Sequence, residues 1–319
     1  MNRLVIIIHL VIIGLLLGLQ FVLPPFHHGM VARIMVLAAY AVGYNVLLGY
    51  TGLMSLGHAM FFGAGMYATG LAAFYLGFGP VEAFLIGLAA SIVLSILMGL
   101  ITLRTSGVSF LIVTMMFAQV FYLATLYFNR ITGGDQGLIL TGRLPPIHLR
   151  TLDLTVADPA VKYNVALVVF ALCFLLSLWL VRSPAGRVLI AIRENEDRTR
   201  MLGYNTFAYK LLALAASGAL SGMAGSAYTL LFSYVGSSFV SILFSIYPLL
   251  WTLLGGVGTT IGPLVGTALM TYLVDIASGI RAIKDSYLIV VGFTLVILIM
   301  WFPSGIVGSV RARWMRWLP

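Results

Sequence analysis

Charged residues are scarce in this chain: they make up 8% of its 319 residues, against 61% hydrophobic residues. A soluble domain carries about 25% charged residues, and nine acids with eighteen bases cannot cover a soluble globule of this length. The shortage excludes an ordinary soluble enzyme, and the hydrophobic excess excludes a disordered chain. The composition therefore predicts an all-α integral membrane protein that crosses the bilayer many times.

Cysteine is nearly absent, and acids are outnumbered by bases. The single cysteine, Cys173, lies in an apolar run, which excludes a disulfide within the chain and favours a packed side chain. The net charge of +9 comes without a basic stripe interleaved with aromatic residues, so nucleic acid is not an expected partner. Excess Lys and Arg is instead typical of the cytoplasmic loops of membrane proteins.

Machinery for energy conversion or catalysis is also missing from the sequence. None of the three lysines follows a glycine, which excludes the phosphate-binding P-loop and nucleotide hydrolysis by that route. A carrier driven by protons or sodium buries several ionisable groups, yet the candidates are only Glu82, Asp275 and His58. No nucleophile–base pair or metal-ligand spacing emerges, so we expect no enzyme activity and no cofactor on this chain.

Long apolar stretches are plentiful, and about 20 such residues cross a bilayer as a helix. We predict about ten transmembrane helices, some of them short or broken by glycine, in a single transmembrane domain over residues 1–319. The expected spans are Leu4–Leu23, Met30–Leu48, Gly57–Leu76, Val81–Leu103, Gly107–Tyr127, Tyr163–Val181, Ala208–Leu231, Ser241–Leu254, Ile261–Ile276 and Tyr287–Trp301.

The distribution of Lys and Arg predicts the orientation of these spans. Three of the nine acids and five of the eighteen bases lie between Arg182 and Arg200, and a second basic run, Arg311, Arg313 and Arg316, ends the chain. Both runs fall on one side of a ten-span protein, together with Arg3. We expect cytoplasmic N- and C-termini, a cytoplasmic loop over 183–206 and a periplasmic loop over 129–162.

The cytoplasmic loop has the pattern of two short helices. Pro184 suits the first position of a helix, and Val188, Leu189 and Ile192 then fall on one face. Asn195 is a good N-cap, with Glu196 and Asp197 in the next first turn, Arg198 and Arg200 near its end, and Gly203 after it. The loop is either a solvated connector or a docking element for a soluble partner.

Two glycine-rich interruptions break the hydrophobic pattern, one at 49–65 and the other at 255–266. Broken helices in two halves of a chain frame the pathway of many transporters. Glycines four residues apart, such as Gly258, Gly262 and Gly266, also permit close helix packing. The two interpretations are compatible.

Four ordered blocks between residues 30 and 280 resemble a known family. They are Asn45-Val-Leu-Leu-Gly-Tyr-Thr-Gly-Leu-Met-Ser-Leu-Gly-His-Ala59 with Phe61 to Tyr67, Thr132-Gly-Gly-Asp-Gln-Gly-Leu138, Gly186-Arg-Val-Leu-Ile-Ala-Ile-Arg193 through Gly203 to Lys210, and Leu254-Gly-Gly-Val-Gly-Thr-Thr-Ile-Gly-Pro263. Together they are similar to the LivM-type permeases of bacterial branched-chain amino acid ABC transporters. Related permeases for urea and short amides carry similar blocks.

The resemblance implies partners and a division of labour. It implies a second, homologous permease subunit of the LivH type, two cytosolic ATPase subunits that hold ATP and Mg²⁺, a periplasmic substrate-binding protein, and a place in the bacterial inner membrane. The loop that couples to an ATPase would then use Arg187, Arg193, Glu194, Glu196, Asp197, Arg198 and Gly203.

The same resemblance suggests where substrate passes. The translocation pathway would border Tyr50, Thr51, Ser55, His58, Phe62, Gly256 and Gly258, and the periplasmic partner would contact Thr132, Gly133, Gly134 and Asp135. The expected function is import of branched-chain or other hydrophobic amino acids by alternating access. The alternatives are a permease for urea or short amides and, in a different class, a secondary carrier that works alone.

Overall fold

The computed structural model describes residues 3–142, 147–149, 152–154, 158–280 and 286–314. Parts of the predicted 129–162 loop, and Arg316 of the terminal basic run, lie outside the described residues. The prediction of an all-α membrane protein is confirmed, because every predicted span forms a helix. These helices are α1 (Arg3–Val22), α2 (Pro25–Thr51), α3 (Ala59–Leu76), α4 (Pro80–Thr102), α5 (Val108–Tyr127), α7 (Pro159–Arg182), α10 (Thr206–Phe232), α11 (Ile242–Gly255), α12 (Gly262–Gly279) and α13 (Tyr287–Trp301).

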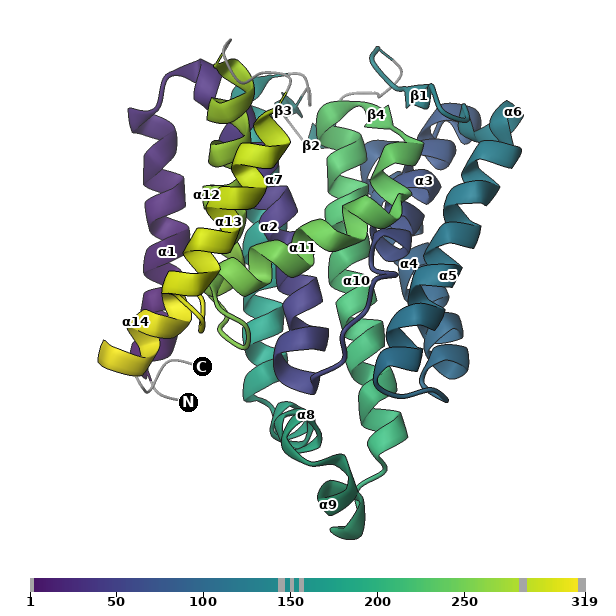
Figure 1. The fold of residues 1–319 in the computed structure, drawn as a ribbon. Helices are drawn as coiled ribbons and strands as arrows, with labels where there is room; N and C mark the ends of the chain where they lie inside the picture. Colours follow the sequence, from purple (N-terminus) through teal and green to yellow (C-terminus); the bar gives the residue numbers. More distant parts are fainter. Residues whose placement is uncertain (1–2, 143–146, 150–151, 155–157, 281–285, 315–319) are drawn as a thin grey trace.

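Seven helices of the described chain are long and apolar enough to cross a membrane: α1 to α5, α7 and α10. The other three predicted spans are α11, α12 and α13. The 14-residue α11 contains Pro248, which cannot donate a backbone hydrogen bond. It runs obliquely across the bundle, whereas α12 and α13 run side by side along one flank (Figure 1).

Proline and glycine set several helix boundaries. Pro25 occupies the first turn of α2, so this helix begins five residues before the predicted Met30. At its other end, Gly52 adopts a left-handed conformation (φ 75°) and its N–H bonds the carbonyl of Leu48 at 3.1 Å. A proline therefore starts this helix and a left-handed glycine ends it.

Short elements join the long helices. They are α6 (Asn129–Thr132), α8 (Pro184–Glu194), α9 (Glu196–Met201), α14 (Ile306–Trp314), the 3-10 helix η1 (Ser237–Val240), and the strands β1 (Leu138–Ile139), β2 (Ile147–Leu149), β3 (Leu152–Leu154) and β4 (Tyr234–Val235). The antiparallel pairs are β1 with β4 and β2 with β3. Of these elements, the sequence predicted only α8 and α9.

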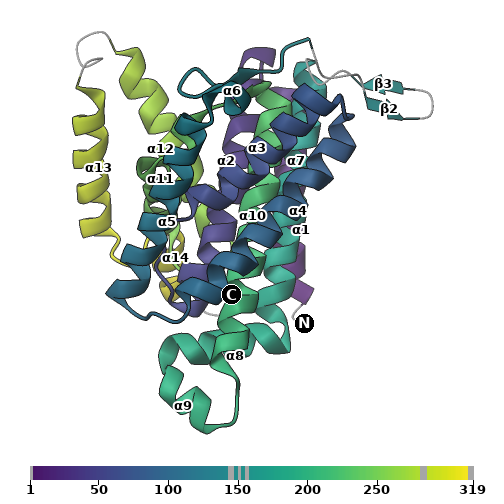
Figure 2. The same ribbon diagram turned by 90° about the vertical axis from the view of Figure 1, so that its right-hand side faces the viewer.

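The two ends of the bundle differ. One end carries the start of α1, the helix α14 and the protruding α8 and α9, and is termed the N/C end (Figures 1 and 2). The opposite end carries α6 and the four strands and is termed the strand end. The predicted cytoplasmic and periplasmic loops thus lie at opposite ends of the molecule.

The core is built around α2 and α10. Helix α10 packs against α2, α3 and α4, and α2 also packs against α7. Glycines let α3 and α10 approach closely: a Cβ on Gly225 would lie 2.0 Å from the carbonyl oxygen of Phe62. The spanning window of α2 is 94% buried, whereas that of α1 is 11% buried. Helix α2 is therefore central and α1 peripheral.

Candidate coupling and translocation site

The turn from α7 into α8 is made by adjacent cap and glycine residues. The Ser183 hydroxyl accepts a hydrogen bond from the N–H of Gly186 at 3.1 Å, which caps α8. A Cβ on Gly186 would lie 2.2 Å from the carbonyl oxygen of Val181, so only glycine permits this sharp turn. The predicted apolar face is confirmed, because Val188, Leu189 and Ile192 are all buried.

The second predicted helix of the loop also forms. The Asn195 side chain accepts from the N–H of Arg198 at 2.8 Å and caps α9. Gly203 follows the helix in a left-handed conformation with φ 88°. The local sequence therefore determines α8 and α9, and Figure 1 shows them projecting beyond the rest of the bundle.

Most predicted coupling residues lie on the exposed surface of this projection. The side chains of Arg187, Glu194, Asp197 and Arg198 are exposed. The apolar side chains of Met201 (81% exposed) and Leu202 (72% exposed) end the same element. A surface with both charge signs around exposed apolar residues has the character of a protein-binding surface.

Glu196 has a different role, because it fastens α9 to the base of α10. Its carboxylate pairs with the buried Lys210 and with Arg200, the latter at 3.3 Å. Partial burial acts to raise the pKa of Glu196, but the hydrogen bond and charge of Lys210 outweigh it and hold the pKa below its usual 4.5. The pair makes the projecting element part of the bundle rather than a loose loop.

Arg193 connects α8 to both glycine-rich interruptions. Its guanidinium donates a hydrogen bond to the carbonyl oxygen of Gly49, in the last turn of α2. The same side chain packs against Gly52 and Gly258, two glycines with a left-handed backbone conformation. A Cβ added to Gly52 would lie 3.1 Å from Cγ of Arg193, and a Cβ added to Gly258 would lie 2.8 Å from its Nη1. A displacement of α8 would therefore act directly on the end of α2 and on the 256–261 loop.

Asn45 joins the two glycine-rich segments directly. Its amide group donates to the carbonyl oxygen of Thr259 at 2.8 Å and accepts from the N–H of Gly258 at 3.0 Å. Arg311 of α14 adds a 3.1 Å hydrogen bond to the carbonyl oxygen of Gly258. The sequence placed Asn45 only at the start of a block and Arg311 only in the terminal basic run, because neither pairing is visible in local spacing.

Hydrogen bonds within the 256–261 loop and to the peripheral helix α1 also fix this loop. The Thr259 hydroxyl donates to the carbonyl oxygen of Gly256 at 2.7 Å, and Thr260 meets His9 of α1 at 2.7 Å. A groove of about 450 Å³ opens beside the loop at the N/C end, lined in part by Arg193, Ser304 and Arg311. Close packing contributes as well, since a Cβ on Gly266 would lie 1.9 Å from the carbonyl oxygen of Trp251. The close-packing interpretation is therefore confirmed for Gly266.

An irregular segment, 52–58, connects α2 to the start of α3, and His58 is its last residue. His58 is fully buried, with Nε2 2.8 Å from the Ser217 hydroxyl. Ser217 donates its one proton to the carbonyl oxygen of Gly43 at 2.5 Å, so the histidine must donate from Nε2. Its Nδ1 then has no partner among the described residues.

An aromatic cluster extends from His58 toward the strand end. Tyr40 and Phe244 stack with ring centroids 5.5 Å apart, and Phe62 lies within 5.0 Å of both. The Ser245 hydroxyl caps α3 by accepting from the N–H of Ala59 at 2.9 Å. This cluster joins α2, α3 and α11 in the middle of the molecule.

The predicted pathway residues do not form one surface. Tyr50, Thr51, Ser55, His58 and Phe62 are buried, and Gly256 and Gly258, in the loop that follows α11, are buried as well, so none of them lines an open surface. The Tyr50 hydroxyl lacks a partner among the described residues, and the Thr51 hydroxyl bonds the carbonyl oxygen of Val46 at 3.2 Å. Their role in translocation stays a prediction.

At the strand end, the block from Thr132 forms a compact turn. The Thr132 hydroxyl donates to the carbonyl oxygen of Thr125 at 2.5 Å and accepts from the N–H of Gly134 at 3.2 Å. Gly133 and Gly134 have positive φ angles of 77° and 57°, as a tight turn requires. Asp135 is exposed and accepts a 3.4 Å bond from Ser237 of η1. The turn presents this carboxylate on the outer surface.

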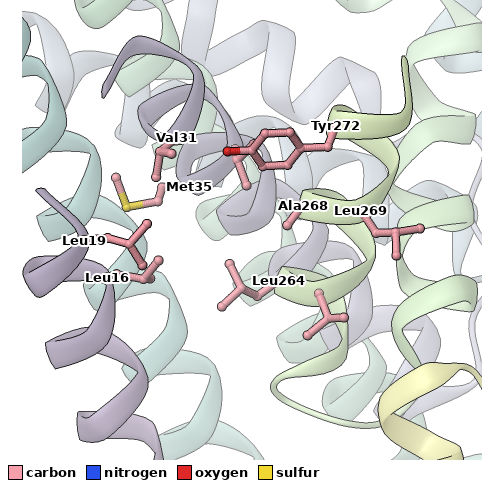
Figure 3. A pocket seen from close by; sticks show the side chains of 10 residues that line it. Leu16, Leu19, Val31, Met35, Leu264, Ala268, Leu269 and Tyr272 are labelled. Carbon is pink, nitrogen blue, oxygen red and sulfur yellow. The ribbon is translucent and has the colours of Figure 1, made fainter. Parts of the chain in front are cut away.

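A second groove, of about 420 Å³, lies between α1, α2 and α12 (Figure 3). Leu16 and Leu19 line one side, Val31 and Met35 another, and Leu264 and Tyr272 the third. Its lining carries no charged side chain, so it offers nothing to orient a zwitterionic solute.

The apolar bundle, with seven helices long and apolar enough to cross a bilayer among the described residues, defines a multi-pass membrane protein. A sequence model described as "Branched-chain amino acid transport system / permease component" matches residues 28–300. The chain therefore belongs to this family of membrane permeases.

Curated relatives agree with this assignment. The chain is 26% identical over 300 residues to the high-affinity branched-chain amino acid transport system permease protein LivM of Salmonella typhimurium and to that of Escherichia coli K12; each match covers 88% of this chain and 69% of the relative. It is 31% identical over 142 residues to the corresponding protein BraD of Pseudomonas aeruginosa, covering 44% of this chain and 45% of BraD. No solved structure matches the chain.

Proposed function

We propose that this chain is the translocating subunit of an ATP-driven importer for branched-chain or other hydrophobic amino acids in the bacterial inner membrane. The observation that carries the proposal is the bonding of Arg193 to the end of α2, beside Gly258. A docked partner that moved α8 would move both glycine-rich segments. The names of the relatives supply the substrate class.

The ATP hydrolysis that drives this importer takes place on other chains. Two cytosolic ATPase subunits bind ATP and Mg²⁺, and this chain binds no cofactor. The exposed Arg187, Glu194, Asp197 and Arg198 dock one ATPase, with Met201 and Leu202 providing apolar contact. On this proposal, the N/C end faces the cytosol.

Transport follows from coupled movement. ATP binding closes the ATPase pair and displaces α8 and α9, and Arg193 transmits the displacement to α2 and the 256–261 loop. The passage lies between this chain and a second, homologous permease subunit, and opens alternately to each side. A periplasmic binding protein delivers the amino acid at the strand end. This protein contacts the turn formed by Thr132, Gly133, Gly134 and Asp135.

The coupling assignment is tested by charge reversal in the purified complex. Reversing Arg193 and Glu194 together is expected to lower ATPase stimulation by the ligand-loaded binding protein at least tenfold, with membrane insertion intact. The single variant Glu194→Arg isolates docking, because this exposed side chain does not anchor the bundle. Arg104→Glu, in the exposed connection of α4 and α5 at the same end, is the matched control and should keep its stimulation.

Two results would contradict the proposal in different ways, and a third would change one part of it. Unchanged stimulation in the double variant would remove α8 and α9 from the docking surface. Uptake by this chain reconstituted alone, following a proton or sodium gradient, would identify a secondary carrier. A binding-protein partner that binds urea or a short amide instead of leucine would change the substrate class only.

A further inference from the structure

Arg33 is an exception within the central helix α2. Between residues 31 and 51 of this helix every residue is buried except Arg33, which is exposed. A charged side chain within a membrane-spanning helix is costly unless water or a partner reaches it. Arg33 lies in the first half of α2, which begins at the strand end, and its exposure shows that the neighbouring described helices leave this side chain uncovered.

The direction of Arg33 follows from helix geometry. At about 100° per residue, Arg33 shares one face of α2 with Tyr40 and Tyr44. Val31 and Met35 point the opposite way, into the apolar groove shared with α1 and α12 (Figure 3). Arg33 therefore faces away from that groove, about two helical turns outward of Tyr40 and the aromatic cluster.

The surroundings of Arg33 are aromatic and positively charged. Its guanidinium interacts electrostatically with the Tyr228 hydroxyl on α10. Tyr228 lies 4.6 Å from the ring of Phe232 and 4.8 Å from that of Phe239, and Lys162 of α7 lies 5.1 Å from the Phe232 ring. The partly exposed Phe239 belongs to η1 at the strand end.

Neither cation has a carboxylate partner among the described residues. In the part of the chain that the structure describes, every ion pair joins residues between 196 and 210. A guanidinium offers a planar fork of donors that matches a carboxylate in two parallel hydrogen bonds. Such a bond is stronger beside low-polarity aromatic walls than in water, so this place favours a small anion with an apolar body.

We propose that Arg33 binds the α-carboxylate of the amino acid where it enters the passage, with Tyr228 and Phe239 forming the wall beside its apolar side chain. The inference rests on the proposed function and adds to it a contact that distinguishes an amino acid from a neutral amide. Lys162 contributes positive charge at the same entrance without binding the carboxylate itself.

The test measures equilibrium binding of radiolabelled leucine to the full transporter complex in nanodiscs, without the binding protein. Arg33→Gln is expected to weaken leucine binding at least tenfold, and Arg33→Lys to restore part of it. Leucinamide, which lacks the carboxylate, should bind the wild-type complex weakly and lose nothing further in Arg33→Gln. Arg130→Gln, an exposed arginine of α6 at the same end, should bind leucine within twofold of wild type.

Each contrary result has a separate meaning. Leucine binding that is unchanged in a monodisperse Arg33→Gln complex overturns the inference alone. A second outcome is that leucine binding is unchanged but the leucine-loaded binding protein docks at least tenfold more weakly. Arg33 would then pair with a carboxylate on that protein, and the inference would be overturned. A wild-type complex that binds urea or a short amide but no leucine overturns the inference and changes the substrate class of the proposed function.

Discussion

At the scale of single residues, conformation and contact decide which glycines matter. Gly258 and Gly203 both have positive φ angles, 71° and 88°. A Cβ on Gly258 would lie 2.8 Å from Nη1 of Arg193, whereas a Cβ on Gly203 would meet open space. The two positions therefore separate backbone strain from disturbance of the coupling contact.

We predict that Gly258→Ala uncouples the transporter and that Gly203→Ala does not. Each substitution forces a left-handed conformation that costs an L-residue about 1–2 kcal/mol. Only Gly258→Ala also displaces Arg193, so its ATPase stimulation should fall at least fivefold beyond any loss in Gly203→Ala. Stimulation and thermal unfolding are measured on both complexes. Equal losses of stimulation in the two variants would show that strain alone is responsible.

At the scale of elements, α8 and α9 behave as one lever because Glu196 ties α9 to α10. The pKa of Glu196 in the folded chain lies below its usual 4.5. A carboxyl group with a lowered pKa adds stability above its unfolded pKa and loses it as the pH falls through the folded value. Anchoring of α9 is therefore complete at neutral pH and is lost only in acid.

We predict that Glu196→Gln loosens α9 at neutral pH by leaving the buried Lys210 without its partner. Hydrogen exchange of residues 196–205, corrected for intrinsic rate, should become faster at pH 7 in this variant. The wild type should reach the same exchange only in acid, below the usual carboxyl pKa of 4.5, because the pKa of Glu196 is lowered. Asp197→Gln, which alters an exposed carboxylate beside it, is the control. Protection in Glu196→Gln equal to wild type would dismiss the anchoring role.

At the scale of the whole molecule, the two ends carry different structural elements. The projecting α8 and α9 lie at the N/C end, and α6 and the four strands lie at the strand end (Figures 1 and 2). Arg33 lies in the first half of α2, the helix that begins at the strand end. Tyr40, His58 and Phe62 fill the interior between them. A solute that crosses the membrane must therefore pass beside this packed core or after it has rearranged.

We predict that the two ends lie on opposite sides of the membrane. Cys173 is buried and is the single cysteine, so Cys173→Ala provides a background for labelling. In that background, Asp197→Cys should react with an impermeant maleimide only in inside-out vesicles, and Asp135→Cys only in right-side-out vesicles. Labelling of both positions from the same side would contradict this prediction. The Cys173→Ala background should stay unlabelled in either orientation.

Particular residues show how far sequence reasoning reached. The apolar spacing of Val188, Leu189 and Ile192 and the cap Asn195 correctly predicted α8 and α9, because caps and helix faces depend on neighbours within a few positions. Sequence reasoning did not predict the hydrogen bonds of Asn45 to the 256–261 loop, because the partners lie more than 200 residues apart in the chain. Sequence reasoning also did not predict the strand pair β1–β4, whose partners Leu138 and Val235 are distant in the chain as well.

The sequence by itself determined the class of protein, the helices, their caps and the charged projection. Hydrophobicity and local hydrogen bonding act over one or two helical turns, so they can be read without a fold. Only the tertiary structure decided that Arg193 lies on Gly49 beside Gly258, that His58 is sealed in the core and that Arg33 is not. These facts depend on which helix faces meet, and the packing of distant segments alone selects among those faces.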